Sequence, residues 1–110
     1  MLQGRILIVV AAIAMMVWIP SPRAEAYPMI GCPLDIVAAF EENGTEDMAC
    51  ATSWCESRWE ETATGGAGER GLFQIHPIHG ALSSYDRDTN IRAAYILSKG
   101  GRDWSQWSCG

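Results

Sequence analysis

Apolar residues recur at spacings of three and four in three segments of the chain, which is the pattern of an amphipathic helix. The first segment is 33–42. It opens with Pro33, which suits a first helical position because the N–H that proline lacks would be unpaired there anyway. Asn43-Gly44 follows as a helix stop. We expect the apolar stripe of this helix to consist of Leu34, Val37 and Ala38, widened on one flank by Ile36 and Phe40.

The second helix is expected over residues 46 to about 57, with Thr45 as its N-cap. Within it, Cys50 and Cys55 are five positions apart, about 140° around the helix axis, so these two should not pair with each other. The apolar side of this helix is predicted to comprise Met48, Ala51 and Cys55, with Trp54 beside them.

The third helix is expected over residues 89–99, capped by Asp88 and stopped by Gly100-Gly101. Its predicted apolar face consists of Ile91, Ala94, Tyr95 and Leu97.

The segments between and after the helices carry turn-forming residues. Four glycines between positions 65 and 71 predict that 62–71 is a loop. A short apolar stretch follows at 72–75, and 78–87 is expected to be a loop or a single turn. These patterns predict one small, mainly α domain.

The first 26 residues have the features of an export signal rather than of the domain. An apolar run of about 14 residues, 6–19, is shorter than the roughly 20 that span a bilayer. Prolines at positions 20 and 22 interrupt it, and Ala24-Glu25-Ala26 has the small-x-small pattern of a cleavage site. We expect a signal peptide at 1–26, with a retained N-terminal anchor as the alternative, and a domain at 27–110 that is secreted or associated with the cell wall.

All four cysteines lie after the expected cleavage site, and an even number in an exported chain indicates two disulfides. A domain this small buries a modest fraction of its surface, so covalent staples help it fold. Zinc is the competing interpretation, but the chain has no Cys-x-x-Cys pair. Sequence alone leaves three pairings open.

The charge balance excludes some partners. Between positions 27 and 110 there are twelve Asp and Glu residues against six Arg and Lys, with no basic run, which argues against nucleic acid. Four tryptophans in the same range (Trp54, Trp59, Trp104 and Trp107) fit core, disulfide cover or a platform for sugar rings.

The strongest candidate for chemistry is Glu56, at the expected C-terminal end of the second helix. The negative end of the helix dipole favours the protonated carboxyl, and desolvation by Trp54, Trp59 and Phe73 would do the same. A raised pKa is what a general acid for a glycosidic oxygen needs. The alternative is that Glu56 is one solvated carboxylate among twelve.

Three sequence blocks carry a resemblance to a known family. Glu56-Ser57, then the GLFQI stretch at 71–75 with Pro77, then Asn90-Ile91 and Tyr95-Ile96-Leu97 occur in that order. Together they resemble the soluble lytic transglycosylases of the lysozyme-like superfamily. The short domain and its Cys-Glu-Ser triplet are also similar to the catalytic domain of resuscitation-promoting factors, although those proteins usually have glycines where this chain has Arg58-Trp59.

The resemblance implies a small lysozyme-like domain that cleaves the glycan strands of peptidoglycan, with Glu56 as general acid. It implies that Ser57 steadies the site, that Gln74 lines the groove and that Tyr95 lies near the catalytic Glu. Each has a structural alternative: Ser57 as a helix cap, Gln74 as a loop amide, and Tyr95 as part of the apolar face. The resuscitation-promoting factors further imply the disulfides Cys55–Cys109 and Cys32–Cys50.

The reaction type depends on a second carboxylate. Ordinary glycosidases use two, but none of Glu60, Glu61, Glu69 and Asp86 occupies a matching family position, and Glu69 beside Arg70 is interpreted as a solvated loop charge. The family's lytic transglycosylases use one Glu, first as acid and then as base while a 1,6-anhydro ring closes. We therefore favour lytic transglycosylation, with hydrolysis by a muramidase as the alternative.

No metal or other cofactor is predicted. The series Asp86, Asp88, Asn90 mimics the start of a calcium loop, but the required Gly and Glu are missing, so helix capping is the preferred interpretation. His76 and His79 are separated by Pro77, which disfavours a shared metal. A monomer is expected. The competing functions are a catalytically silent wall-binding module, a secreted growth-signalling factor, and a phage or secretion accessory that opens the wall locally.

Overall fold

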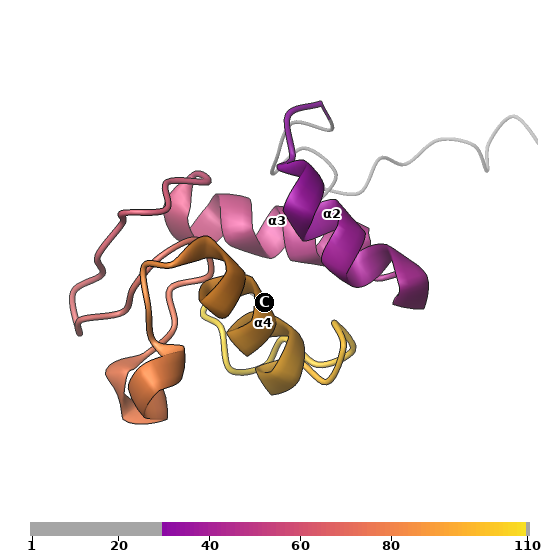
Figure 1. Cartoon of the computed structure of the whole chain (residues 1–110). Coiled ribbons are helices and arrows are strands. Elements are labelled where there is room, and N and C mark those ends of the chain that lie inside the picture. Colours follow the sequence, from indigo (N-terminus) through magenta and orange to yellow (C-terminus); the bar gives the residue numbers. More distant parts are fainter. Residues whose placement is uncertain (1–29, 110) are drawn as a thin grey trace, which may run out of the picture.

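The computed structural model describes residues 30–109, so the expected signal peptide at 1–26 lies outside the described residues. Figure 1 shows α2 crossing α3, with α4 beside them and the 58–76 segment forming one side of the domain. Within residues 30–109, no helix is long and apolar enough to cross a membrane. The predicted mainly α fold is confirmed, and its elements are α2 (Leu34–Phe40), the 3-10 helix η2 (Glu41–Asn43), α3 (Glu46–Ser57), the 3-10 helix η3 (Pro77–Leu82) and α4 (Arg87–Leu97).

Helix α2 buries a different stripe from the predicted one. Ile36 and Phe40 are fully buried, whereas Leu34 is 82% exposed, and Pro33 is the N-cap rather than the first helical residue. Seven residues make about two turns, so both stripes satisfy the helical spacing and periodicity alone does not separate them. The aromatic side chain of Phe40 buries the larger area, which decides the orientation.

Helix α3 has the predicted bounds but a more polar buried face. Ala49 and Ser53 are fully buried, whereas Cys55, predicted to be on the apolar side, is exposed. The Ser53 hydroxyl donates to the Ala49 carbonyl, which satisfies it inside the core. Thr45 occupies the N-cap position, and its carbonyl accepts the Ala49 N–H, but its hydroxyl does not cap the helix and instead donates to the Gly100 carbonyl.

Helix α4 begins two residues before the predicted start. Its cap is Asp86, whose carboxylate accepts the backbone N–H of Thr89, so the prediction of Asp88 as cap was wrong. The predicted capping role of the Asp86 series is thus confirmed, but at its first member. Asn90 is fully buried on the inner face of α4, where Ala93 also packs, while Tyr95 is 36% exposed.

The Asn90 side chain forms hydrogen bonds with the backbone of the segment that precedes α4. Its oxygen accepts the Phe73 N–H, and its amide donates to the carbonyls of Arg70 and Ser84. Gly71, at φ +81°, lies so close to this amide that a Cβ would clash with it. One buried amide therefore sets the path of residues 70–73, and this segment contacts the end of α3 through the hydrogen bond from the Ser57 hydroxyl to the Leu72 carbonyl.

The aromatic residues of the tail belong to the core. Trp104 and Trp107 are 6% and 8% exposed and pack with Phe40 and Phe73 in a chain of ring contacts. Both indole N–H groups are satisfied by backbone, that of Trp107 by the Phe73 carbonyl at 2.7 Å. Both side chains therefore pack in the core, and Trp107 also presents an edge to the pocket described below.

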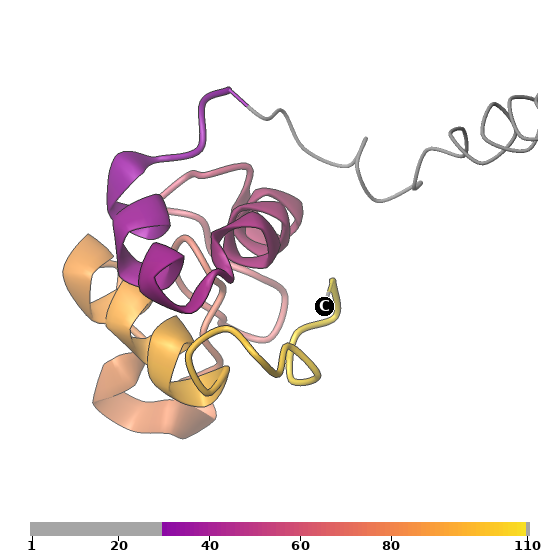
Figure 2. The same cartoon turned by 90° about the vertical axis from the view of Figure 1, so that its right-hand side faces the viewer.

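Two disulfides staple the domain with the pairing that the resemblance implied. Cys32–Cys50 joins the segment before α2 to α3, and Cys55–Cys109 joins the end of α3 to the tail. Figure 2 shows that tail passing the end of α4 and returning toward the body of the domain.

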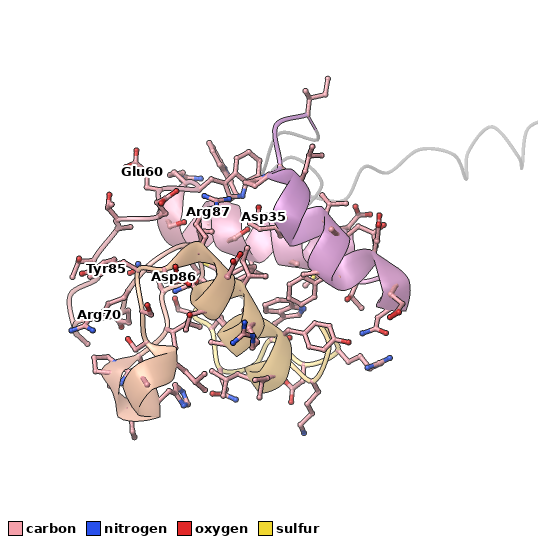
Figure 3. All side chains as sticks on the ribbon, in the orientation of Figure 1. Asp35, Glu60, Arg70, Tyr85, Asp86 and Arg87 are labelled. Carbon is pink, nitrogen blue, oxygen red and sulfur yellow. A yellow bond between two sulfur atoms is a disulfide. The ribbon has the colours of Figure 1, made fainter. Side chains whose placement is uncertain are left out.

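The guanidinium group of Arg87 joins three segments at the surface of the domain (Figure 3). Arg87, the first residue of α4, contacts both carboxylate oxygens of Asp35 on α2 at 2.9 and 3.0 Å. It also reaches the Glu61 carboxylate at 2.9 Å. The bidentate geometry fixes the crossing of α2 and α4 and anchors the start of the 60–70 loop.

Candidate functional site

A pocket of about 180 Å³ opens beside the C-terminal end of α3. Its walls come from α3, from the 69–76 segment, from η3, from the end of α4 and from the disulfide-bonded tail. The lining side chains are Glu56, Glu69, Gln74, Ile75, His76, His79, Leu97, Gln106, Trp107 and Ser108.

Glu56 is the half-buried carboxylate of this pocket. Burial raises its pKa above the ordinary value of 4.5, and the nearby Glu69 carboxylate raises it further. Two tail donors act in the opposite direction: the Cys109 N–H at 3.3 Å and the Ser108 hydroxyl at 3.4 Å both donate to Oε2. The raised pKa means that Glu56 keeps its proton to a higher pH than a solvated Glu does.

The apolar groups around Glu56 are not those predicted from the sequence. Ile75, Leu97 and Trp107 line the pocket. Trp54 and Trp59 instead form an edge-to-face pair, with the Trp59 indole N–H donating to Ser53.

Ser57 lies next to Glu56 in the chain but does not line the pocket. Its buried hydroxyl donates to the carbonyls of Ser53 and Leu72 and accepts the N–H of Trp59. Ser57 therefore ties the end of α3 to the 72–75 segment. This arrangement fits the steadying role and the capping role equally, and gives no direct contact to a substrate in the pocket.

Gln74 lies in the same pocket as Glu56, and its role toward a substrate stays a prediction. Its Nε2 donates to the carbonyls of Ala63 and Gly71, both at 3.0 Å, so the orientation of the amide is fixed by the loop. The backbone of Gln74 is left-handed, with φ +50°. A side chain held in a sparsely populated backbone conformation is a frequent feature of functional sites.

Tyr95 lies elsewhere. Its hydroxyl accepts a hydrogen bond from Asn43, its ring packs on Phe40, and it lines an open groove between α2 and α4 instead of the Glu56 pocket. The expectation that Tyr95 lies near the catalytic Glu is therefore not met. On the surface of α4, one position changes the direction of a side chain by about 100°, so a motif match along the sequence does not fix which pocket a residue faces.

Four further residues line the pocket, of which the sequence offered Glu69 only as one of four candidate carboxylates, the two histidines as turn or groove-edge residues, and Ser108 not at all. Glu69 is partly exposed, as expected of a loop charge, but it lies in the pocket with Glu56. The two histidines of η3 and its cap also line it. The tail residue Ser108 was missed, although the disulfide that the resemblance implied would have placed it beside Glu56. Among residues 30–109, no group of three or more His, Cys, Asp or Glu is arranged to hold a metal ion.

Comparison with known families gives one match. The family model described as a lysozyme-like domain matches residues 37–109, which span α3, the pocket loops, α4 and the tail. No curated protein and no solved structure matches the chain. The narrower likeness to resuscitation-promoting factors stays a prediction.

Proposed function

Because the chain belongs to the lysozyme-like domain family, we propose that it cleaves the β-1,4 bond between N-acetylmuramic acid and N-acetylglucosamine in peptidoglycan, with Glu56 as the general acid. The family supports a glycosidase-type enzyme that acts on peptidoglycan. The residue and the bond are our proposal.

The observation that carries the proposal is the environment of Glu56. It is a half-buried carboxyl in a pocket, and burial raises its pKa. The protonated carboxyl donates to the bridging oxygen as the bond between that oxygen and C1 of the muramic acid breaks. The two tail donors to Oε2 then stabilise the carboxylate that remains, because charge-assisted hydrogen bonds strengthen as the negative charge develops.

Location and partners follow from the same features. Two disulfides and a domain that acts on peptidoglycan fit an extracellular location. We propose that the chain is exported, works as a monomer and meets glycan strands in the wall. Since the charge of the domain is negative, attraction to the anionic wall does not guide binding, and the shape of the pocket must do so.

The reaction has two forms after the bond breaks. In lytic transglycosylation the 6-hydroxyl of the muramic acid closes on C1, and Glu56 alone serves as acid and then base. In hydrolysis a water molecule attacks, and a second carboxylate takes its proton. The sequence favoured transglycosylation because no second carboxylate was evident. Glu69 lies in the pocket with Glu56, so the argument from a missing second carboxylate is weaker.

The test compares the unmodified, disulfide-bonded protein with Glu56→Gln and Glu60→Gln variants on dye-labelled, purified peptidoglycan. Glu60 is an exposed carboxylate outside the pocket lining, so its variant controls for loss of one negative charge. We expect the Glu56 variant to lose at least about 100-fold in dye release, the range for removing a general acid, and the Glu60 variant to be unchanged. Equal release by all three would overturn the proposal. Binding of labelled wall without release by the unmodified protein would favour the silent wall-binding module.

A further inference from the structure

Glu69 shares the pocket with Glu56 although the two come from different elements. Glu56 is on the last turn of α3, and Glu69 is in the glycine-rich loop that follows. The carboxylates are close enough for the charge of Glu69 to act on Glu56. Ion pairs reach Glu61 and Asp35, but among residues 30–109 no ion pair includes Glu69.

The loop holds the Glu69 carboxylate in a fixed position. The backbone of Glu69 is closed onto Gly65, whose N–H donates to the Glu69 carbonyl at 2.8 Å. The carboxylate itself accepts the Ala67 N–H at 3.0 Å. Such a folded-back turn orients the side chain, in contrast to the free movement of an ordinary surface glutamate.

Glu69 and Gln74 present acceptor oxygens to the same point. A Cβ on Gly65 would meet Oε1 of Glu69 and Oε1 of Gln74 at once, so the two oxygens lie beside the same glycine, and both would have to move to admit a side chain there. Because the Gln74 nitrogen is engaged by two loop carbonyls, its oxygen is the atom that faces Glu69. Two acceptors that converge in this way suit a molecule that donates two hydrogen bonds, and water is such a molecule.

Resting on the proposed role of Glu56, we propose that Glu69 is the second catalytic carboxylate, the general base that activates a water molecule held against Gln74, so that this domain is an inverting hydrolase. Inverting glycosidases pair an acid and a base from separate positions, with room for water between them. A pocket of about 180 Å³ has room for this water beside a sugar ring.

The electrostatic environments of the two carboxyls suit Glu56 to act as the acid and Glu69 to act as the base. Burial raises the pKa of Glu56, whereas backbone N–H groups, first that of Glu69 itself and then that of Ala67, lower the pKa of Glu69, and the neighbouring His76 lowers it further. Because the two pKa values are moved apart, a pH range exists in which Glu56 is protonated and Glu69 is ionised. Two carboxyls whose environments push their pKa values apart are assigned as acid and base.

The step balances without a further reactant. The water oxygen forms a bond to C1 of the muramic acid while its proton passes to Glu69. The C1–O4 bond breaks, and O4 of the N-acetylglucosamine takes the proton of Glu56. The products are a reducing muramic acid of inverted configuration and a free 4-hydroxyl, and proton exchange with solvent resets the two carboxyls.

The first experiment identifies the muropeptides released from purified peptidoglycan in ¹⁸O-labelled water by mass spectrometry. We expect the unmodified protein to release reducing ends that carry ¹⁸O, the Glu69→Gln variant to lose at least about 100-fold in their formation, and the Glu60→Gln control to keep it. Anhydro ends alone from the unmodified protein, or undiminished ¹⁸O incorporation by the Glu69 variant, would overturn the role of Glu69 and leave that of Glu56 intact. No release at all by the unmodified protein would overturn the proposed function itself.

The second experiment separates a base from a structural residue. We expect azide to restore cleavage by a Glu69→Ala variant, because a small anion attacks C1 without needing a base, and to yield a glycosyl azide of inverted configuration. We also expect the acidic limb of the pH–rate profile to disappear in this variant, since that limb reports ionisation of the base. A folded Glu69→Ala variant that azide does not rescue, and whose acidic limb is unchanged, would overturn the proposal.

Discussion

The disulfide between Cys55 and Cys109 links the stability of the domain to the chemistry of its pocket. Cys109 follows the tail residue Ser108, and both donate to Glu56. Replacing both cysteines by serine removes the covalent link between the tail and α3. We expect a large loss of stability together with a separate loss of activity.

The stability loss is set by the length of chain that the bridge closes. The two cysteines are 54 positions apart, which in the chain-entropy treatment gives about 4 kcal/mol. Cys32 and Cys50 are 18 positions apart, which gives about 3 kcal/mol. A domain of this size has a free energy of unfolding of roughly 5–10 kcal/mol, so each double variant is weakened but still folds at low temperature.

The activity loss has a local cause. Trp104 and Trp107 hold the tail in the core up to position 107, so loss of the bridge releases mainly Ser108 and Cys109. Glu56 then loses its two tail donors while the fold persists. Loss of the Cys32–Cys50 bridge affects no pocket-lining residue, which makes that variant the matched control.

The assay pairs guanidinium unfolding, followed by tryptophan fluorescence, with peptidoglycan cleavage at a temperature where both variants are folded. We expect the Cys55/Cys109 variant to be the less stable by about 1 kcal/mol and to lose activity, and the Cys32/Cys50 variant to keep its activity. Full activity in the folded Cys55/Cys109 variant, or a larger stability loss in the control, would refute the reasoning.

Three further predictions concern single contacts. Ser108→Ala removes a hydrogen bond that lowers the pKa of Glu56, so the alkaline limb of the pH–rate profile should move to slightly higher pH; a shift to lower pH would contradict this. Asn90→Leu keeps the volume but leaves buried backbone groups without partners, so thermal unfolding should show a loss of about 3 kcal/mol, and a loss under 1 kcal/mol would contradict that account. The Arg87 hydrogen bonds hold the pKa of Asp35 below 3.8, so their contribution is present above that pH and is lost as the pH falls through the folded pKa. Arg87→Met should therefore destabilise the domain by about 1 kcal/mol at pH 7 and flatten the decline in stability below pH 4. An unchanged dependence of stability on pH below 4 would contradict a stabilising Arg87–Asp35 interaction.

The sequence was sufficient for features that depend on local spacing. The bounds of α3 followed from Thr45 at its N-terminal boundary and from its acidic first turn, and the position of Glu56 on the last turn followed from those bounds. The disulfide pairing followed from the resemblance. The bounds of the helix need no knowledge of how distant segments meet, whereas the pairing of two cysteines 54 positions apart came only from the resemblance.

Other features depend on tertiary contacts and were missed for that reason. The buried face of α2 is decided by the packing of Phe40, which a two-turn helix does not encode by periodicity. The place of Glu69 depends on a loop that is closed by the Gly65–Glu69 backbone hydrogen bond and held at its end by the buried Asn90. For Tyr95 the sequence motif matched, but the orientation of α4 directs the side chain toward Asn43 and not into the Glu56 pocket.

The central claim is that burial keeps a proton on Glu56 and that this proton is delivered to the glycosidic oxygen. Its most direct test is a titration of the Glu56 side-chain carboxyl by ¹³C NMR, assigned with Glu56→Gln, alongside the pH dependence of peptidoglycan cleavage. We predict a pKa above 4.5 that coincides with the alkaline limb of activity. A Glu56 carboxyl that titrates at or below 4.5, or an alkaline limb that lies elsewhere, would contradict the account.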